Sequence, residues 1–542
     1  MKPQTVLRGV GVAVIVSLAW PAVAMAQRLT PLPRAMPGGA RAAAIAQPSA
    51  ANAPAVASRW RPLTHQPTFL TCGTLNANGA ANPILLTDGS VLVQDAGCQD
   101  WWKLTPDQHG SYVSGTWTQV ASLAPDYSPL YYSSAVLPDG RLIIEGGEYN
   151  FFAPVWTTLG AIYDPVANTW TPVAPPPFFS AFGGTIGDAQ SVVLANGTYM
   201  QANCCTPQAA LLDAKSLTWT PTGSGKFDVN DEEGWTLLPD GTVLTVDAYV
   251  GSYSANATGS EIYHPRSGAW RSGGSTIVQL WDSCGGANGA SNEVGPAVLW
   301  PDGTVFYTGA NGCAAGHTAI YNSRSGTWRA GPDFPNGLDI SDGPAALEPN
   351  GRVLMMASPG IFQSGAVFLE WDGRRLNEVP GTPNAAIDSS YYGNMLVLPT
   401  GQILLTDFSN DIEIYTPRPP SDDLLEAERP IIAFSPRHIR GGNSYQISGF
   451  RFNGVSQGAA YGDDVQAATN YPLVRIKNLA SGHVFYARTH DHSSMAVASQ
   501  DFVWTHFDVS SRQESGPSQL VVVVNGVASR PVSVQVGRGG DD

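Results

Sequence analysis

The chain has 542 residues, a formal net charge of −15 and only 13% charged residues. This acidic balance argues against a nucleic-acid partner, because such proteins need a basic surface to neutralise phosphates. The 58 glycines and 42 prolines supply many turns. Together with the scarcity of charged helix surfaces, they predict an all-β fold.

The first 26 residues have the pattern of a secretory signal peptide. Lys2 and Arg8 form a basic start, the apolar run GVGVAVIVSLAW follows, and AMA at residues 24–26 fits a cleavage site. An uncleaved membrane anchor is the alternative, but the apolar run is short for a bilayer span. We therefore expect cleavage, a secreted or periplasmic location, and no membrane span in the mature chain.

Six cysteines are consistent with an oxidising compartment, although the sequence does not fix how they pair. The most local pairs leave Cys204 and Cys205 side by side. These two would form either a vicinal disulfide, whose strained ring tends to lie at binding sites, or two buried thiols. The local pairs are Cys72–Cys98 and Cys284–Cys313, and all six cysteines are disulfide candidates.

One pattern recurs along the chain: an apolar run, a turn that ends in glycine, and a second β-rich run. It is clear in AVLPDGRLIIEGG and in TLLPDGTVLTVD, where each Asp-Gly pair suits a tight hairpin. Seven copies, spaced between 44 and 62 residues apart, predict a seven-bladed kelch-like β-propeller. The turn glycines are Gly89, Gly140, Gly197, Gly241, Gly303, Gly351 and Gly401.

Tryptophans downstream of five of these turns are expected to pack each outer strand against the neighbouring blade. The last repeat ends at IEIYTP without such a strand, and SRWRPL, at residues 58–63, supplies one. We interpret this as ring closure, which removes open sheet edges. The five tryptophans are Trp117, Trp170, Trp219, Trp270 and Trp328.

Composition divides the chain into segments. The Ala- and Pro-rich stretch after the signal lacks periodicity and is expected to be a disordered tether. Short alternating strands such as SYQISGF and LVVVVNG near the end predict an Ig-like β-sandwich. The expected segments are a signal peptide (1–26), the tether (27–57), the propeller (58–418), a linker (419–430), the sandwich (431–537) and a tail (538–542).

A signal peptide, a seven-bladed kelch-type propeller and a C-terminal Ig-like domain together resemble the galactose oxidase and glyoxal oxidase family, over residues 58–536. The resemblance implies one copper on the propeller axis, held by two tyrosines and two histidines. One of those tyrosines is cross-linked to a cysteine and holds a radical. The matching motifs are YYSS for the cross-linked tyrosine (Tyr131), YYGNMLVLPTG for the axial tyrosine (Tyr391), and ARTHDHSS for a histidine (His490, with His492 beside it).

The chain departs from this family pattern at the residues that carry the radical chemistry. The residue after the axial tyrosine is Tyr392 where the family has histidine, and the cysteine position falls on Ala80. Cys72 lies too far upstream unless that strand is bulged. The family's shielding tryptophan is replaced by Tyr149. Without the thioether link a tyrosyl radical has a higher potential and no protected resting place, so we do not expect a Tyr-Cys radical cofactor.

Acidic residues recur at the start of four consecutive inner strands, in GDAQ, DEEG, NEVG and SDGP. Each acid alone is most simply a solvated loop residue. Because the set recurs at one phase, it predicts an axial channel that also receives the tyrosines. The expected lining is Tyr149, Asp188, Glu232, Glu293, Asp342 and Tyr392.

Such a channel suits several ligands. Oxygen-rich linings bind hard cations, and imidazole with carboxylate binds other metals. Carboxylates with aromatic rings also suit a sugar, and paired carboxylates act as acid and base on glycosides. The sequence does not identify the metal, whether copper or another divalent ion.

Two functions follow, and the missing cysteine and histidine favour the first. In the first, the chain is a monomeric protein that binds a carbohydrate, a cell-surface ligand or another small molecule. The alternative is a copper-dependent oxidase of alcohols or aldehydes, with Tyr131 and Tyr391 catalytic and with His490 as a third metal ligand. In that case His490 should reach the channel mouth, within hydrogen-bond or ligand distance of either tyrosine, with Asp491 or a backbone carbonyl orienting its ring.

Overall fold

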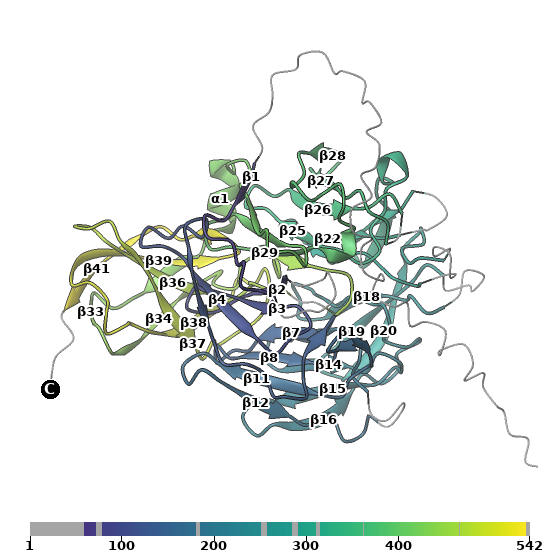
Figure 1. Ribbon diagram of the computed structural model, residues 1–542, viewed down its shortest axis with the longest axis horizontal. Helices are drawn as coiled ribbons and strands as arrows, with labels where there is room; N and C mark the ends of the chain where they lie inside the picture. Colours follow the sequence, from purple (N-terminus) through teal and green to yellow (C-terminus); the bar gives the residue numbers. More distant parts are fainter. Residues whose placement is uncertain are drawn as a thin grey trace, which may run out of the picture. The chain divides into compact units, whose positions relative to one another are not determined.

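The computed structural model describes residues 59–71, 79–179, 185–250, 257–283, 291–310, 315–360, 362–464 and 467–537. The expected signal peptide, tether and tail lie outside these residues, as do Cys72, Cys284 and Cys313. Within them the regular structure is almost entirely β, as predicted (Figure 1). The described part of the chain holds no helix long and apolar enough to cross a membrane.

The described residues contain seven antiparallel sheets of four or five strands, which we number in chain order. Sheet 1 has β2 (Ala80–Leu85), β3 (Val91–Asp95), β4 (Trp101–Thr105) and β5 (Thr116–Gln119). Sheet 2 has β7 (Ser133–Val136), β8 (Leu142–Glu145), β11 (Gly160–Asp164) and β12 (Thr169–Val173). Sheet 3 has β13 (Ser191–Val193), β14 (Tyr199–Ala202), β15 (Ala209–Asp213) and β16 (Thr218–Thr222).

Four further sheets repeat this order. Sheet 4 has β17 (Thr236–Leu237), β18 (Val243–Val246), β19 (Gly259–His264) and β20 (Ala269–Ser275). Sheet 5 has β21 (Ala297–Leu299), β22 (Thr304–Thr308), β23 (Thr318–Asn322) and β24 (Thr327–Ala330). Sheet 6 has β25 (Ala345–Leu347), β26 (Val353–Ala357), β27 (Val367–Trp371) and β28 (Leu376–Val379). Sheet 7 has β29 (Asn394–Val397), β30 (Ile403–Thr406), β31 (Glu413–Tyr415) and β1 (Trp60–Pro62).

The repeated turn of the sequence joins the first two strands of each sheet. At all seven turn glycines φ lies between 76° and 87°, a left-handed conformation that a side chain would disfavour. In sheet 2, Gly140 N–H donates to Leu137 O at 2.9 Å, and Asp139 Oδ1 accepts from Arg141 N–H at 3.1 Å. The first strands are buried, whereas the fourth strands are mostly exposed. The turn pattern of the sequence therefore located each of the seven numbered sheets correctly.

Neighbouring sheets are joined by the predicted tryptophans. The indole of Trp170 in sheet 2 donates to Ala121 O at 2.8 Å, just after sheet 1, and that of Trp219 in sheet 3 donates to Ala174 O at 2.7 Å, just after sheet 2. Trp117 and Trp328 make equivalent bonds to the sheets before theirs. Trp270 is the exception, because its indole N–H finds no hydrogen-bond partner in the described part of the chain.

The N-terminal strand completes sheet 7, as the sequence predicted. β1 pairs with β31 in antiparallel register, with Trp60 opposite Tyr415. The Trp60 ring packs 4.9 Å from the rings of Phe368 and Tyr415, and its indole donates to Pro380 O at 2.8 Å. β2 also contacts β29. Sheets 1 and 7 are therefore neighbours, and Trp60 ties sheet 7 to sheet 6.

The last part of the chain forms a nine-stranded sheet with its own apolar core. The helix α1 (Asp422–Glu428) precedes it, inside the segment expected to be a plain linker. The strands of this C-terminal sheet are β32 (Ile431–Phe434), β33 (His438–Arg440), β34 (Ser444–Phe450), β36 (Leu473–Asn478), β37 (Val484–His490), β38 (Phe502–Asp508), β39 (Gly516–Val524), β40 (Val527–Ala528) and β41 (Val532–Gly537).

Between β34 and β36 the chain leaves the C-terminal sheet and contacts the first strands of the numbered sheets. We call residues 455–464 and 467–471 the inserted segment. Its strand β35 (Ala459–Ala460) pairs with β25, and β35 also contacts β21 and β29. Gln457 Oε1 accepts from Leu237 N–H at 2.8 Å, so the inserted segment also contacts sheet 4. The fit is tight, because a Cβ on Gly462 would lie 2.5 Å from Asp342 Oδ1.

We expect Trp60→Ala to destabilise the protein by about 3–5 kcal/mol, the usual cost of removing a buried tryptophan side chain. The matched control is Trp504→Ala in the C-terminal sheet, because Trp504 is 36% exposed whereas Trp60 is 6% exposed. Guanidinium unfolding followed by circular dichroism measures both changes. Equal, small effects would show that the N-terminal strand does not hold the sheets together.

Candidate functional site

Four of the predicted lining acids converge on one acid of the inserted segment. Side-chain oxygens of Asp188, Glu232 and Asp463 lie within 4.8 Å of one another, and so do those of Glu293, Asp342 and Asp463. Asp463 is therefore shared by two groups of three carboxylates. We call these five residues the carboxylate cluster. The predicted acids stand immediately before the first strands of sheets 3, 4, 5 and 6.

A recurring backbone turn presents these acids. Glu232 and Asp342 have φ values of 61° and 51°, and Asn292, next to Glu293, has a φ of 65°. Tyr131, at the corresponding place before sheet 2, has a φ of 49°. For residues with a side chain this left-handed conformation costs about 1–2 kcal/mol each. Such turns persist where the surrounding structure holds them, which is common at functional sites.

Four acids of the cluster, Asp188, Glu232, Glu293 and Asp342, gather without a basic partner in the described part of the chain. Burial raises the pKa of Glu232, Glu293 and Asp342 well above the ordinary range, and repulsion from neighbouring carboxylates raises it further. In the described part of the chain, neither these three acids nor Asp188 forms an ion pair with lysine, arginine or histidine. The site therefore attracts cations.

Several oxygens of the site are buried without a hydrogen bond. Among the described residues, Tyr131 Oη finds no such partner, and Glu232 Oε2, Glu293 Oε2 and Asp342 Oδ1 have none outside the hydrogen bonds that these three carboxyl groups share with one another. Buried oxygens without partners are costly, and most native proteins satisfy them with a donor, a water or an ion. Carboxylate and phenol oxygens are the donors that hard cations prefer.

Tyrosines form one wall beside the cluster. The ring of Tyr131 lies 6.1 Å from Tyr149 and 6.5 Å from Tyr461, and Tyr461 Oη donates to Tyr391 O at 2.7 Å. The Tyr391 and Tyr392 rings are 4.3 Å apart. Burial, followed by the nearby Tyr391 and Glu148 groups, raises the pKa of Tyr131. The structure thus brings all four predicted tyrosines together.

Short elements place these rings. Tyr131 follows β6 (Pro129–Leu130), which pairs with β9 (Tyr149–Asn150) in a small sheet completed by β10 (Ala153–Pro154). Because Leu130 stands opposite Tyr149 in the register, the two tyrosines emerge side by side. Tyr391 lies in a 3₁₀ turn, Ser390–Tyr392, immediately before β29. Its backbone is therefore fixed at the start of sheet 7.

The structure does not bring His490 to the tyrosines. Its ring nitrogens contact Asp491 Oδ2 at 2.8 Å and Asp508 Oδ1 at 3.0 Å, whereas Tyr131 Oη has no hydrogen-bond partner in the described chain. His492 N–H donates to Pro138 O at 2.9 Å, at the opposite end of β7 from Tyr131. At about 3.3 Å per residue, the strand separates those ends by roughly 20 Å. The expected contact between Asp491 and the His490 ring is present, but not at the channel mouth where the sequence predicted it, and Asp508 contacts the other ring nitrogen.

The donor set does not fit the copper centre implied by the family resemblance. Ala80 stands in β2 where the family has cysteine, and Tyr392 stands where it has histidine. None of the described histidines hydrogen-bonds or stacks with Tyr131 or Tyr391. The groups that do gather are oxygen donors. Such a set suits a hard cation better than a nitrogen-ligated copper.

Residues that the sequence did not assign to the channel complete it. Asp463 comes from YGDD in the inserted segment, and its paired acids were the available signal. Burial raises the pKa of Glu148 to about 8, with further contributions from Asp463 and Asp231, so Glu148 belongs to the same charged region. Glu233, by contrast, pairs with the buried Lys226 at 2.9 Å and belongs to a separate internal ion cluster.

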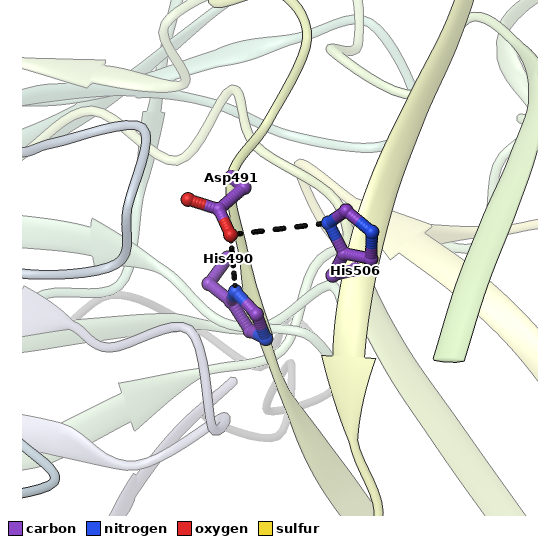
Figure 2. A group of neighbouring side chains, drawn as sticks. All are labelled: His490, Asp491 and His506. Carbon is purple, nitrogen blue, oxygen red and sulfur yellow. Dashed lines mark hydrogen bonds and ion pairs between the residues drawn. The ribbon is translucent and has the colours of Figure 1, made fainter. Parts of the chain in front are cut away.

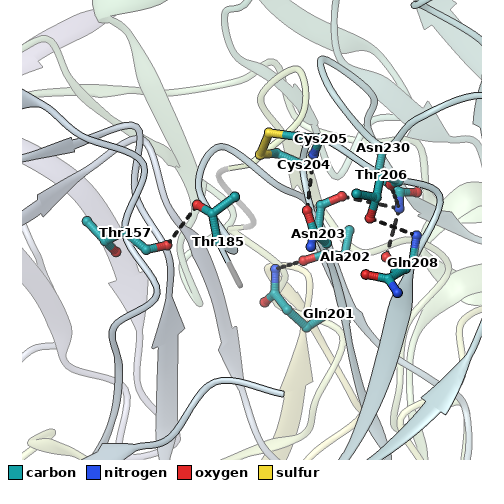
Figure 3. Close-up of a disulfide and its surroundings, with 10 residues drawn as sticks. All are labelled: Thr157, Thr185, Gln201, Ala202, Asn203, Cys204, Cys205, Thr206, Gln208 and Asn230. Atoms are coloured by element: carbon teal, nitrogen blue, oxygen red, sulfur yellow. Dashed lines mark hydrogen bonds between the residues drawn. A yellow bond between two sulfur atoms is a disulfide. The ribbon is translucent and has the colours of Figure 1, made fainter. Parts of the chain in front are cut away.

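The cysteine pair supports one loop of the site. Cys204 and Cys205 are joined by a disulfide, which decides between the two alternatives left by the sequence (Figure 3). Cys204 N–H donates to Ile186 O at 3.1 Å, two residues before Asp188. A Cβ on Gly187 would lie 2.9 Å from Cys204 Sγ, so the bridge packs directly against this loop. Cys98 is disulfide-bonded as well.

The same turn supports the neighbouring loop. Cys205 N–H donates to Asn203 Oδ1 at 3.2 Å, which fixes the bridged turn (Figure 3). Asn230 Nδ2 donates to Thr206 O at 2.8 Å and to Gln208 O at 2.9 Å. Because Asn230 is two residues before Glu232, the turn contacts the loops that present two acids of one group.

Comparisons with known proteins give distant likenesses. No family model and no curated protein matches the chain. A solved fungal alcohol oxidase of the AA5 family, in complex with copper, is 12% identical, with 85% of this chain and 97% of that chain covered and a TM-score of 0.47. Virginiamycin B lyase from Staphylococcus aureus is 9% identical, covering 66% of this chain and 98% of that chain, with a TM-score of 0.43.

A third solved structure is the extracellular domain of a hybrid two-component system, BT4673, from B. thetaiotaomicron. It is 11% identical, with 85% of this chain and 57% of that chain covered and a TM-score of 0.41. At such identities and scores, none of these likenesses carries an activity over to this chain.

We expect Cys204→Ser combined with Cys205→Ser to loosen the two loops while changing global stability little, because a bridge between adjacent residues closes a very small loop. Amide hydrogen exchange should speed up at residues 185–188 and 230–233. Residues 216–219, at the other end of sheet 3, serve as the internal control. Unchanged exchange in both loops would contradict a supporting role for the disulfide.

Proposed function

We propose that this chain is an exported binding protein whose carboxylate cluster holds a hard divalent cation and, with the tyrosines, a hydroxyl-rich ligand such as a carbohydrate. The observation that carries the proposal is the pair of carboxylate groups that share Asp463. Calcium fits this set, because it takes about 6–8 oxygen ligands in flexible geometry. A cation would satisfy the oxygens that lack hydrogen bonds and cancel the repulsion between the acids.

The ligand class follows from what surrounds the cation. Asp188, Glu232, Glu293 and Asp342 are only half-buried, so the cluster is open to a small molecule. A cation that keeps open positions binds sugar hydroxyls, and carboxylates accept hydrogen bonds from other hydroxyls. The faces of the half-buried Tyr131 and Tyr392 suit the apolar face of a sugar ring.

We also propose how the sheets are arranged as domains. We take the seven sheets as blades of one propeller, because each runs from a buried first strand to a more exposed fourth strand and because β2 contacts β29. We take residues 431–537 as an Ig-like sandwich that carries the inserted segment to the axis. Export rests on the signal pattern of residues 1–26, and N-terminal sequencing of protein recovered outside the inner membrane tests it.

A copper-dependent oxidase is the second candidate. The proximity of Tyr131 and Tyr391 favours it, since these are the positions that match the family's two tyrosine ligands. The lack of a nearby imidazole or cysteine weighs against it. Peroxide release from alcohols or aldehydes by copper-loaded protein would support the oxidase instead of the binding protein.

We expect metal-free protein to lose stability as the pH rises from about 4.5 to about 8, and calcium to abolish that loss. The pKa of Glu148 is raised to about 8 in the folded protein, so the folded state binds more protons than the unfolded state in this window. Its stabilising contribution is complete below about 4.5 and disappears as Glu148 ionises. Thermal unfolding at several pH values, with calcium or with EDTA, measures the effect.

Asp463→Asn should strongly weaken the stabilisation of the protein by calcium, because both carboxylate groups that share Asp463 lose a charged ligand. Asp240→Asn is the matched control, since Asp240 is an exposed turn residue whose Oδ1 accepts from Thr242 N–H at 3.0 Å. If calcium stabilises the Asp463→Asn protein as well as the unmodified protein, the cation is not in the cluster.

We expect oligosaccharides selected on a glycan array to bind in calcium and to be released by EDTA. Tyr392→Ala should weaken binding by roughly 0.5–1.5 kcal/mol through loss of a stacked ring, while Asp240→Asn leaves it unchanged. Isothermal titration calorimetry measures both variants. Binding that survives EDTA and Tyr392→Ala would place the ligand elsewhere, and binding of no glycan at all would refute the ligand class.

A further inference from the structure

Two histidines face each other across neighbouring strands of the C-terminal sheet. In the antiparallel register of β37 and β38, His490 stands directly opposite His506. Their rings lie 5.6 Å apart and are tilted by only 23°. Because side chains alternate along a strand, both rings project from the same, outward face. Figure 2 shows Asp491 placed between them.

Asp491 supplies a carboxylate oxygen to both rings. Its Oδ2 lies 2.8 Å from His490 Nδ1 and 3.9 Å from His506 Nδ1. Asp491 has a φ of 50°, and this turn at the end of β37 brings its side chain back over the strand. One ligand atom from each of the three residues therefore lies within 4.8 Å of the others.

The rest of the surroundings matches a metal site. His490 Nε2 lies 3.0 Å from Asp508 Oδ1 and Nδ1 lies 2.8 Å from Asp491 Oδ2, so a metal that displaces the proton on Nδ1 leaves Nε2–H donating to Asp508. A histidine that donates its second N–H to a carboxylate is the usual arrangement of a metal ligand. His506 Nδ1 is a buried atom that makes no hydrogen bond with any described residue. Its lone pair or proton is therefore unused.

From this geometry we infer that His490, Asp491 and His506 bind a borderline transition-metal ion of the zinc class. Zinc takes nitrogen and carboxylate ligands at about 2.0–2.2 Å, which places tetrahedral ligand atoms about 3.3 Å apart. The two separations from Asp491 Oδ2 lie about half an ångström on either side of that value. Small side-chain shifts complete the site.

Three protein ligands leave one position of a tetrahedral ion open to water or to an anionic group. The position is accessible, because the side chains of His490, Asp491 and His506 are 18%, 53% and 36% exposed. This site shares no residue with the carboxylate cluster. Its two nitrogen donors also select a different class of metal from the calcium proposed there.

Zinc titration of the full chain in calcium-containing buffer tests the inference. We expect one zinc ion per chain, and cobalt(II) should give the intense visible absorption of a tetrahedral site with nitrogen ligands. Asp508→Asn should weaken zinc binding by about 10- to 100-fold, the usual effect of losing the group that orients a ligating histidine. His506→Gln should weaken it more, because a ligand is removed.

His317→Gln is the matched control. His317 precedes β23 of sheet 5 and pairs with Asp333 at 2.7 Å, and it is none of the three proposed ligands, so this variant should bind zinc normally. A second variant, His490→Gln, guards against a folding defect in His506→Gln, and circular dichroism checks both. Zinc affinity and cobalt absorption that survive His506→Gln and His490→Gln would overturn the inference.

Discussion

Repulsion among the carboxylates around Asp463 is the constraint on which the structure of the site depends. Two unit charges 4 Å apart repel by about 4 kcal/mol at an effective dielectric constant of about 20. The carboxyl oxygens of each group lie within 4.8 Å of one another, and none of the predicted acids has a basic partner in the described chain. Protonation or a bound cation must relieve this repulsion. Burial, followed by this repulsion, raises the pKa of Glu232, Glu293 and Asp342 and so favours protonation, and the proposed calcium is the second way to relieve the repulsion.

The surrounding fold holds the acids together against that repulsion. Left-handed turns at Glu232 and Asp342 direct two of them, and the Cys204–Cys205 turn supports the loop of a third. The inserted segment fits too closely to withdraw, since Gly462 leaves no room for a side chain beside Asp342. Rigid sheets therefore supply the scaffold, and short connections before their first strands supply the chemistry.

Local patterns predicted the sheets well, because their signals lie within a few residues. Each turn glycine marks one hairpin, and the absence of a fourth strand after β31 indicated that Trp60 would complete sheet 7. The four predicted acids occupy similar positions just before the first strands of sheets 3 to 6, and the structure brings them together around Asp463. Asp188 and Asp342, which precede the first strands of sheets 3 and 6, both lie close to Asp463.

The choice of the segment that enters between the sheets could not be predicted in this way. The family resemblance pointed to the hairpin of His490, but the structure inserts the residues around Asp463 instead. That choice depends on packing between distant parts of the chain, where small residues such as Ala459 and Gly462 allow close approach. The pairing of His490 with His506 could not be predicted either, because it depends on the register between β37 and β38.

We propose that the carboxylate cluster binds a hard cation, and among the described residues the two groups that share Asp463 consist of carboxylates alone. Diffraction from crystals soaked in terbium, recorded at the terbium absorption edge, tests this most directly. The account predicts an anomalous peak bonded to Asp463 and to carboxylates of at least one group, at about 2.3–2.6 Å as for calcium. A well-ordered crystal with no peak there, or with terbium bound only elsewhere, would contradict it.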